Sequence, residues 1–304
     1  NSNNGSYSLS GSLTYAEPIG QHAQITAEYR INNNYRDADR MTYLYDFDAN
    51  EYLPEMDPDY SNKYNTEYLT QNVGPGFRYG KEGTSISARL NYQNVVMNSD
   101  REYPQAWTLP KKTFHNFTYS ANARIKLDMQ NRITLRVNSR TSNPSVGQLQ
   151  DVVDISNVNN ISSGNPHLKP TYSHSGNLGY IRSGIERGTT FSVNIGATKN
   201  QNTIVDSVVM NKPGFEVYSP DGEFLTTLAS TGRYSKPVNM EGFWNYNGHI
   251  SYGFPLNFIK CNFNIGANAS YSKSPAILNG VVNESTRNSY GANASINSNI
   301  SQYV

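Results

Sequence analysis

The sequence predicts an all-β fold, an antiparallel meander of about eleven strands. Three observations lead to this prediction. Apolar and polar residues alternate strictly over many segments, first in YSLSGSLTY (Tyr7–Tyr15), whereas helical periodicity is essentially missing. The chain contains 23 tyrosines, and tyrosine favours strands. Turn-forming residues separate the alternating segments, as expected of consecutive hairpins.

Alternating segments recur along the whole chain, and each one predicts a strand. In order, the predicted strands are Tyr7–Tyr15, Gln21–Asn32, Thr66–Tyr79, Thr84–Gln93, Phe114–Asp128, Arg132–Arg140, Tyr172–Arg182, Thr189–Lys199, Met240–Phe254, Lys260–Lys273 and Ser289–Asn299.

The composition leaves little apolar material for a protein core. Of 304 residues only 36% are hydrophobic and 16% are charged, and the mean hydropathy is −0.65. Abundant aromatic residues argue against disorder. The net charge of +1 argues against a nucleic-acid partner, which would require a basic surface. A single cysteine, Cys261, excludes an internal disulfide framework.

Connections between the predicted strands alternate between short and long. The short turns lie at 16–20, 80–83, 128–131, 184–188 and 255–259, and the long polar loops at 33–65, 94–113, 141–171, 200–238 and 274–288. A meander of this kind has all of its tight turns at one end. This asymmetry is typical of a transmembrane β-barrel of the bacterial outer membrane, which has short periplasmic turns and longer extracellular loops.

The two faces of the predicted strands differ in the way such a barrel requires. Leu9, Leu13, Ile25, Leu90 and Ile125 fall in the apolar phase, which would contact lipid. The basic residues of the strand centres fall in the polar phase, where they would line a wet interior: Arg30, Arg89, Arg124, Lys126 and Arg136. A basic residue on the lipid face near the midplane would cost about 2–4 kcal/mol. Aromatic residues of the apolar phase near strand ends, such as Tyr15 and Tyr79, predict interfacial girdles.

An odd number of strands does not close a barrel of the bacterial single-chain type, which has an even number. The last alternating segments also continue towards the C-terminus without the terminal aromatic residue of such barrels. We therefore expect residues 1–304 to be part of a larger outer-membrane β-barrel domain, with further strands beyond residue 304.

The stretch GNPHLKP (Gly164–Pro170) resembles the GNPxLKP motif of TonB-dependent outer-membrane receptors, and Pro144–Tyr180 around it resembles the related outer-membrane β-barrel family. In this sequence the motif residues are Gly164, Asn165, Pro166, Leu168, Lys169 and Pro170. We expect a structural role for them, because the two prolines hold the chain extended as it enters the next strand. The strand and loop pattern extends the resemblance to the whole chain at family level.

The resemblance implies a barrel of about 22 strands in the bacterial outer membrane, filled by an N-terminal plug domain, that takes up a nutrient such as a glycan or a siderophore. Its partners would be outer-membrane lipid, the TonB complex through the plug and, as a further candidate, a surface lipoprotein. This chain contains neither a plug domain nor a TonB box. Uptake would therefore belong to the intact parent protein.

Candidate ligand-binding residues lie in the predicted loops. Tyr43, Tyr45 and Tyr52 in the first long loop and Trp107 in the second are candidates for substrate contact, because aromatic rings beside Asn and Asp suit carbohydrates and siderophores. Within loop 33–62, the residues Asp46, Asp48, Asn50 and Asp57 resemble a calcium loop. The resemblance is incomplete, because position six is Glu51 and not Gly.

No catalytic arrangement is recognisable, so we expect a protein that is not an enzyme and has no cofactor apart from the calcium candidate. The five histidines have no ligand-type spacing, and no nucleophile motif is present. The alternative to a transporter is a soluble or surface-exposed β-rich adhesin or solenoid. A solenoid has a constant repeat period, whereas the predicted loops vary from about 12 to 40 residues.

Overall fold

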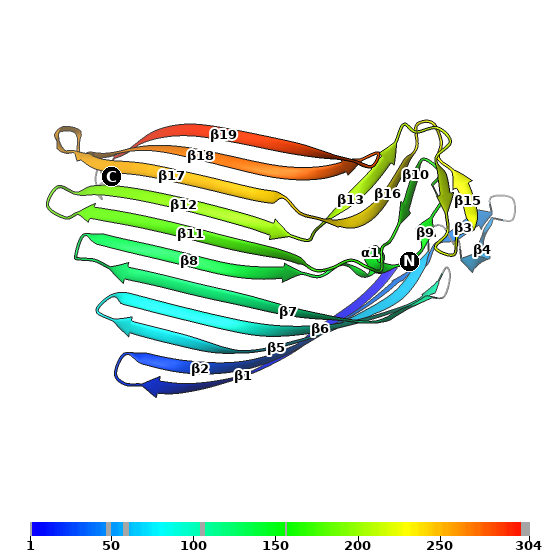
Figure 1. Cartoon of the computed structure of the whole chain (residues 1–304), viewed down its shortest axis with the longest axis horizontal. Coiled ribbons are helices and arrows are strands. Elements are labelled where there is room, and N and C mark those ends of the chain that lie inside the picture. Colours follow the sequence, from blue (N-terminus) through cyan, green and yellow to red (C-terminus); the bar gives the residue numbers. More distant parts are fainter. Residues whose placement is uncertain (1, 47–49, 57–60, 104–106, 156, 299–304) are drawn as a thin grey trace.

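The structure is a computed structural model that describes residues 2–46, 50–56, 61–103, 107–155 and 157–298. Eleven long strands cross one large sheet (Figure 1), and each predicted segment overlaps one of them. They are β1 (Ser2–Ile19), β2 (Ala23–Arg40), β5 (Asn62–Lys81), β6 (Thr84–Tyr103), β7 (Trp107–Lys126), β8 (Asn131–Ser142), β11 (Thr171–Gly184), β12 (Thr189–Gln201), β17 (Phe243–Leu256), β18 (Cys261–Leu278) and β19 (Val281–Ser298).

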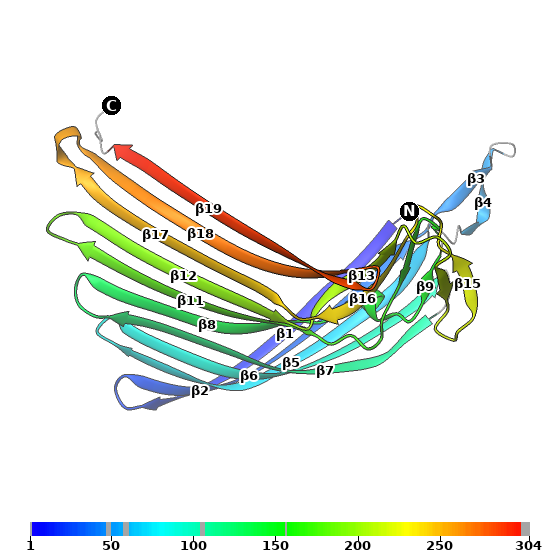
Figure 2. The ribbon, with the colours of Figure 1, turned by 45° about the horizontal axis from the view of Figure 1, so that its top comes forward.

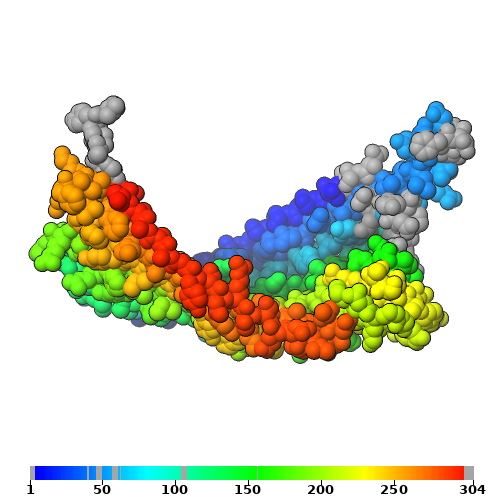
Figure 3. Space-filling view, turned by 90° about the horizontal axis from the view of Figure 1, so that it is seen from above, coloured from blue at the N-terminus to red at the C-terminus, as the bar shows by residue number. Residues whose placement is uncertain are grey.

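Each long strand pairs antiparallel with the next one along the chain, so the predicted meander is confirmed. The strands β1 and β19 lie at the two ends of this series, and within the described ranges the sheet does not close on itself. Figures 2 and 3 show that the sheet is strongly bent and twisted and that the molecule is hollowed along one side. This curvature is the form of a barrel wall.

The turns β1–β2, β5–β6, β7–β8, β11–β12 and β17–β18 lie at one end of the sheet, on the left in Figure 1. The larger connections lie at the other end, together with the two-residue turn between β18 and β19. Two of the five predicted long loops are wrong. Most of 94–113 belongs to β6 and β7, and most of 274–288 belongs to β18 and β19, which are joined by Asn279 and Gly280 alone. Alternation is lost at these strand ends because their faces no longer divide between lipid and water; in β6, for example, Met97 packs against Leu149 and Leu168.

Short elements fill the loop end. They are β3 (Tyr43–Asp46), β4 (Glu51–Met56), α1 (Val146–Leu149), β9 (Val153–Asp154), β10 (Asn160–Ser163), β13 (Thr203–Met210), β14 (Glu216–Tyr218), β15 (Phe224–Thr227) and β16 (Arg233–Met240); a single 3-10 turn, η1 (Asn257–Ile259), lies at the opposite end. The strand β13 pairs parallel with β18 at Ser207–Ile277, along the edge that β17 leaves after Trp244–Lys273. The loop strand β13 therefore continues the wall beyond the point where β17 ends.

The small hydrophobic core lies at this loop end and not at the centre of the sheet. One cluster joins Met97 of β6 and Leu109 of β7 to Leu149 and Leu168 of the segment 143–170. A second cluster joins Ile161, Val217 and Leu228 of the loop elements. A dry core between stacked sheets, which would have contradicted the barrel prediction, is not found among the described residues.

Candidate functional site

The apolar phase of the strands is exposed, as the prediction requires. Leu13 is 73% exposed, Leu90 62% and Ile195 57%, although each lies within a strand of a large sheet. Exposed leucine, isoleucine and aromatic side chains recur on strand after strand of the sheet, whereas soluble monomers rarely expose large contiguous apolar patches. This outer face is therefore suited to contact lipid.

The opposite, polar face is called the inner face here, and on β2 and β6 it carries an ion-pair group. Arg30 lies 2.5 Å from Glu28, and Arg89 forms a second salt bridge to the same carboxylate across β5. The residue of β5 between them is a glycine: Gly76 pairs with Thr26 on one side and with Arg89 on the other. Because Gly76 has no side chain, the Arg89 side chain can cross β5 to reach Glu28.

Five further basic residues gather on the inner face of β5, β7 and β8, towards the short-turn end. This lumenal cationic cluster consists of Arg78, Arg124, Lys126, Arg132 and Arg136. Lys126 pairs with Arg132, whereas Arg124 pairs with the neutral Thr134 and Arg136 with the neutral Asn122. Like charges therefore lie side by side without a carboxylate between them. Within the described part of the chain these charged groups form no ion pair. The cluster gives this part of the inner wall a positive potential.

The inner face of β11, β12, β17 and β18 is neutral instead, and β19 adds Arg287 to it. Asparagine side chains lie over glycines of the neighbouring strand: Asn194 over Gly179, Asn264 over Gly253, and Asn293 over Gly266. Each glycine leaves room for the amide of its cross-strand partner. The inner wall therefore has a cationic half and an amide-lined half, a division that alternation alone did not reveal.

The motif Gly164–Pro170 packs against the sheet, and the structural role expected from its prolines stays a prediction. Leu168 is buried in the cluster with Met97 and Leu149, and the carbonyl oxygen of Pro166 accepts a hydrogen bond from Lys112 Nζ at 3.2 Å. A Cβ atom at Gly164 would overlap the carbonyl oxygen of Gln150. The motif holds the segment 143–170 against the inner face of β6 and β7.

The last residues of the motif connect this segment to β16. Asn165 Nδ2 donates to the carbonyl oxygen of Pro237 at 3.0 Å. Asn239 accepts a hydrogen bond from the Lys169 backbone N–H and donates one to the Lys169 carbonyl oxygen. The backbone of Lys169 is thereby fixed while its side chain stays exposed.

A polar network lies beside the motif and joins residues that are distant in sequence. Asn116 donates to Gln93 Oε1 at 3.1 Å, and Tyr172 OH donates to Asn116 Oδ1 at 3.1 Å. Gln93 also accepts from Thr141 and donates to Asn72. Sequence reasoning missed this network, because its members lie on five strands and have no local spacing. Polar residues in the middle of predicted strands were the only signal available.

The candidate substrate residues are brought together only in part. Tyr45 and Tyr52 face each other across the β3–β4 hairpin, with ring centroids 5.0 Å apart, and Tyr52 is 69% exposed. Tyr43 belongs to the same hairpin, and its hydroxyl lies 3.7 Å from Met41 Sδ. Trp107 begins β7 and pairs through its backbone with Arg101, but its side chain lies outside the described part of the structure.

The candidate calcium residues are not assembled into a site by the described part of the chain. Asn50 Oδ1 accepts a hydrogen bond from Tyr45 OH at 2.9 Å. Asp46 pairs through its backbone with Glu51, whereas Asp48 and Asp57 lie outside the described residues. Among the described residues no group of three or more His, Cys, Asp or Glu side chains could hold a metal ion. The calcium site stays a prediction.

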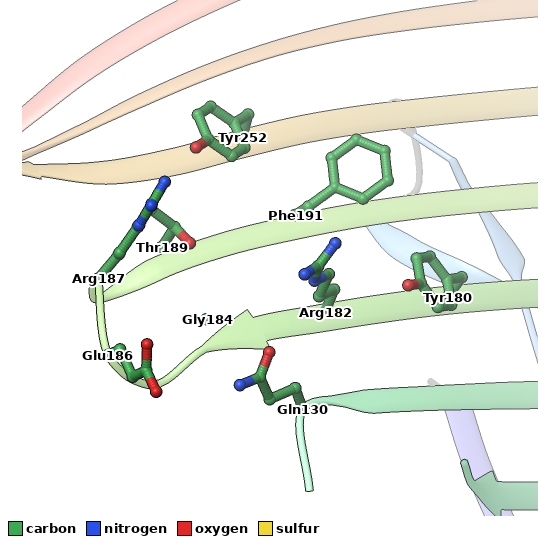
Figure 4. Close-up of a pocket in the computed structure, with 9 residues that line it drawn as sticks. All are labelled: Gln130, Tyr180, Arg182, Gly184, Glu186, Arg187, Thr189, Phe191 and Tyr252. Atoms are coloured by element: carbon green, nitrogen blue, oxygen red, sulfur yellow. The ribbon is translucent and has the colours of Figure 1, made fainter. Parts of the chain in front are cut away.

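The outer face has a pocket at the short-turn end, with a volume of about 690 Å³ (Figure 4). It is lined by residues of β11, β12, β17 and the adjoining turns: Gln130, Tyr180, Arg182, Gly184, Glu186, Arg187, Thr189, Phe191 and Tyr252. Tyr180 and Tyr252 are aromatic residues of the apolar phase near strand ends, the type for which a girdle was predicted, and Phe191 of β12 pairs with Tyr252. In the described part of the chain, no helix is both long and apolar enough to span a membrane.

Comparison with known protein families gives a match over nearly the whole chain. The model of the "Outer membrane protein beta-barrel family" matches residues 1–302. No curated protein matches the sequence.

Among solved structures, the copper transporter OprC is 12% identical, with a TM-score of 0.59 over 90% of this chain and 39% of its own. The alcaligin outer-membrane receptor FauA from Bordetella pertussis is 12% identical (TM-score 0.46; 96% and 48% covered). The hemophore receptor HasR from Serratia marcescens, in complex with its hemophore HasA and heme, is 10% identical (TM-score 0.48; 90% and 56% covered). At these identities only the fold is shared, and the chain spans about half the length of these structures.

Proposed function

The chain belongs to the outer membrane protein β-barrel family, and from this premise we propose that it forms part of a TonB-dependent transporter that takes up a nutrient. It lies in the bacterial outer membrane, and its fold is similar to that of TonB-dependent receptors. The observation that carries the proposal is the opposition of the two faces: exposed apolar side chains outside and a charged, amide-rich wall inside. A wall of this kind encloses a polar passage through lipid.

The proposal includes a barrel larger than the described sheet. Eleven long strands are half of about 22, the number found in plugged outer-membrane transporters. A half-barrel would leave β1 and β19 with unpaired backbone groups in lipid, where each unsatisfied group costs several kcal/mol. Further strands of the intact protein would pair with both edges. A plug domain of that protein would fill the interior and contact the TonB complex.

The substrate would enter at the loop end. The hairpin β3–β4 presents Tyr45 and Tyr52 there, and Tyr103 OH anchors it to β6 by donating to the Met56 carbonyl oxygen at 2.6 Å. Exposed aromatic rings suit sugars and aromatic siderophores. A surface lipoprotein would be a further partner at this end.

Uptake by living cells tests the proposal. Cells with and without the intact protein are supplied with labelled ferric siderophores and labelled oligosaccharides, and accumulation is measured with and without a protonophore. We expect accumulation of one class that requires both the protein and the proton gradient. Accumulation that persists in the protonophore would contradict TonB dependence. Equal accumulation of every compound in both strains would contradict a role in nutrient uptake.

A further inference from the structure

The outer-face pocket at the β11–β12 turn contains an exception to the alternation of the strands. Arg182 belongs to the apolar phase of β11, two residues after Tyr180 and four after the exposed Leu178. Its cross-strand partner on β12 is Phe191, which pairs in turn with Tyr252 of β17. A basic residue on the lipid face costs about 2–4 kcal/mol at the midplane but only about 0–1 kcal/mol near the interface. The position of Arg182 at the strand end keeps this cost small but gives no reason for a basic residue on the lipid face.

A second basic residue reaches the same pocket from the turn. Figure 4 shows Arg182 extending towards Phe191 and Arg187 extending towards Tyr252, with Glu186 of the turn lining the same pocket. Neither guanidinium forms a salt bridge in the described part of the chain. Asp128 of the neighbouring turn attracts Arg182, but its own oxygens accept hydrogen bonds from Gln130 and Asn131.

Neutral donors complete the lining. The Thr189 hydroxyl lies over Gly184, and the Gln130 side-chain amide borders the pocket on the β8 side. No hydrogen bond from either side-chain group is found within the described structure. Two guanidinium groups, a hydroxyl and an amide therefore border one space, and Glu186 supplies the one carboxylate of its lining, so the lining carries a net positive charge. Planar guanidinium groups bind phosphate oxygens in a bidentate manner, which makes arginine the preferred residue for this group.

The aromatic frame indicates how the phosphate would arrive. Tyr180 and Phe191 meet edge to face, with ring centroids 6.2 Å apart, and the Tyr180 hydroxyl donates to Asn131 Oδ1 at 2.6 Å. Such rings lie at the headgroup level of a bilayer, with their polar atoms towards water. Beyond them the apolar phase continues with Leu178 and Ile250, which are 47% and 46% exposed. A ligand with a phosphate at the arginines would find apolar surface directly beside it.

We propose that this pocket binds the phosphate group of a phospholipid from the membrane leaflet on the short-turn side. Arg182 and Arg187 hold the phosphate, Thr189 and Gln130 donate to its remaining oxygens, and the acyl chains lie along Tyr180, Phe191 and the aliphatic residues beyond. The site is distinct from the inner face, so it depends on the membrane placement of the sheet and not on the proposed transport function.

Native mass spectrometry of the intact protein, purified and delipidated in detergent, tests the site. The probes are palmitoyl-oleoyl phosphatidylglycerol, the matching diacylglycerol without phosphate, and inorganic phosphate. The variants are Arg182→Gln, Arg187→Gln and the double variant. Arg124→Gln and Arg136→Gln serve as controls, because they remove the same charge from the opposite face near the same end of the sheet.

We expect one tightly bound phosphatidylglycerol, and a dissociation constant that rises about tenfold or more in the double variant, which corresponds to about 1.4 kcal/mol. The control variants should bind as the wild type does. Equal binding of diacylglycerol, or an unchanged dissociation constant in the double variant, would overturn the proposal. Displacement of the lipid by inorganic phosphate at equal affinity would show a site for free phosphate instead. Because Arg187 lies in an exposed turn, its single variant tests the site even where the double variant folds poorly.

Discussion

Single glycines on the inner face show how closely neighbouring strands approach. At Gly74 of β5 the pairing with β6 is interrupted between Val73–Tyr92 and Gly76–Arg89, and the Leu90 carbonyl group lies directly against the glycine. Pro75, which cannot donate to the ladder, occupies the same irregular position. The sequence contained the signal GPG, but a period-two analysis shows only a gap in the pattern there and not its cause.

A methyl group at Gly74 should therefore destabilise the sheet. In Gly74→Ala the Cβ atom would overlap the backbone oxygen of Leu90, so the strands must separate at a cost of about 1–3 kcal/mol. Gly80→Ala is the matched control, because the same strand offers open space at Gly80. Urea unfolding of the intact protein in lipid vesicles measures both. Equal stability of the two variants would show that the approach of Leu90 to Gly74 has no energetic consequence.

Asp128 is a titratable residue whose environment gives a pH prediction. It lies in the turn between β7 and β8, where hydrogen bonds from the Asn131 side chain and then from the Gln130 backbone hold its pKa below the usual carboxyl value of 3.8. Since the folded pKa is depressed, the carboxylate stabilises the turn above the ordinary pKa. This contribution is lost as the pH falls from the ordinary value through the folded one.

A titration followed by NMR of the Asp128 carboxyl carbon should give a midpoint below that ordinary value. In the Asn131→Ala variant the midpoint should move upward, because the first-named hydrogen bond is removed. A midpoint at or above the ordinary value in the wild type would contradict the hydrogen bonding of the turn.

Among the structural elements, the long strands could be predicted from the sequence and the loop end could not. The eleven segments were found because one face of each contacts lipid and the other water, which forces alternation. Loops 94–113 and 274–288 were placed wrongly, because alternation is lost where the faces no longer divide between lipid and water; at the end of β6, Met97 of the inner face is buried against Leu149 and Leu168. A short hairpin with Asp221 and Gly222 in its turn connects β14 and β15.

The motif Gly164–Pro170 was recognised by its resemblance to a family motif, and its packing gives a physical reason for these residue types. The segment 143–170 must pass close to itself at Gln150 and then bury Leu168 against β6 and β7. The site of contact on Met97 and Leu109 could not be predicted, because these residues looked like part of a polar loop. The candidate tyrosines were placed correctly in one loop, but their meeting across a hairpin depends on the β3–β4 pairing.

The packing of the segment 143–170 predicts opposite effects of alanine substitutions at two glycines. Gly164→Ala should displace the segment, because its Cβ atom would overlap the Gln150 backbone, whereas Gly147→Ala meets nothing and should strengthen the short helix α1. Limited proteolysis of intact cells should cleave 143–170 faster in Gly164→Ala, with a loss of about 1–3 kcal/mol in local stability. Faster cleavage in Gly147→Ala alone would contradict the packing described for the motif.

At the scale of the whole molecule, the two faces make the sheet a boundary between lipid and water. The hydrophobic content that was too low for a globular core is enough for a single-layered wall, because the bilayer supplies the apolar surroundings. The inner face has a cationic half (β5 to β8) and an amide-lined half (β11 to β19), so the electrostatic potential differs between the two sides of the interior. Anionic groups inside the barrel would be drawn towards β7 and β8.

Adjacent residues of β12 test the assignment of the faces. Ile195 lies in the middle of the strand, in the apolar phase and 57% exposed, and its neighbour Asn194 points to the inner face. In Ile195→Lys the charge would enter the hydrocarbon near the midplane and reduce the free energy of folding into a bilayer by about 2–4 kcal/mol. Asn194→Lys adds the same charge to the wet face, where the change should be far smaller.

Folding of the intact protein from urea into vesicles measures this difference. As a control, the free energy of unfolding of the same two variants is measured in micelles of a short-chain detergent. In the thinner, wetter environment of a micelle the cost of Ile195→Lys should fall, because the lysine side chain can reach water. Equal stability of the two variants in vesicles would contradict the assignment of the faces. A lower stability of Asn194→Lys would show that the opposite side of the sheet contacts lipid. The inner wall with its cationic cluster would then contact lipid, and the phosphate pocket would face the water-filled interior.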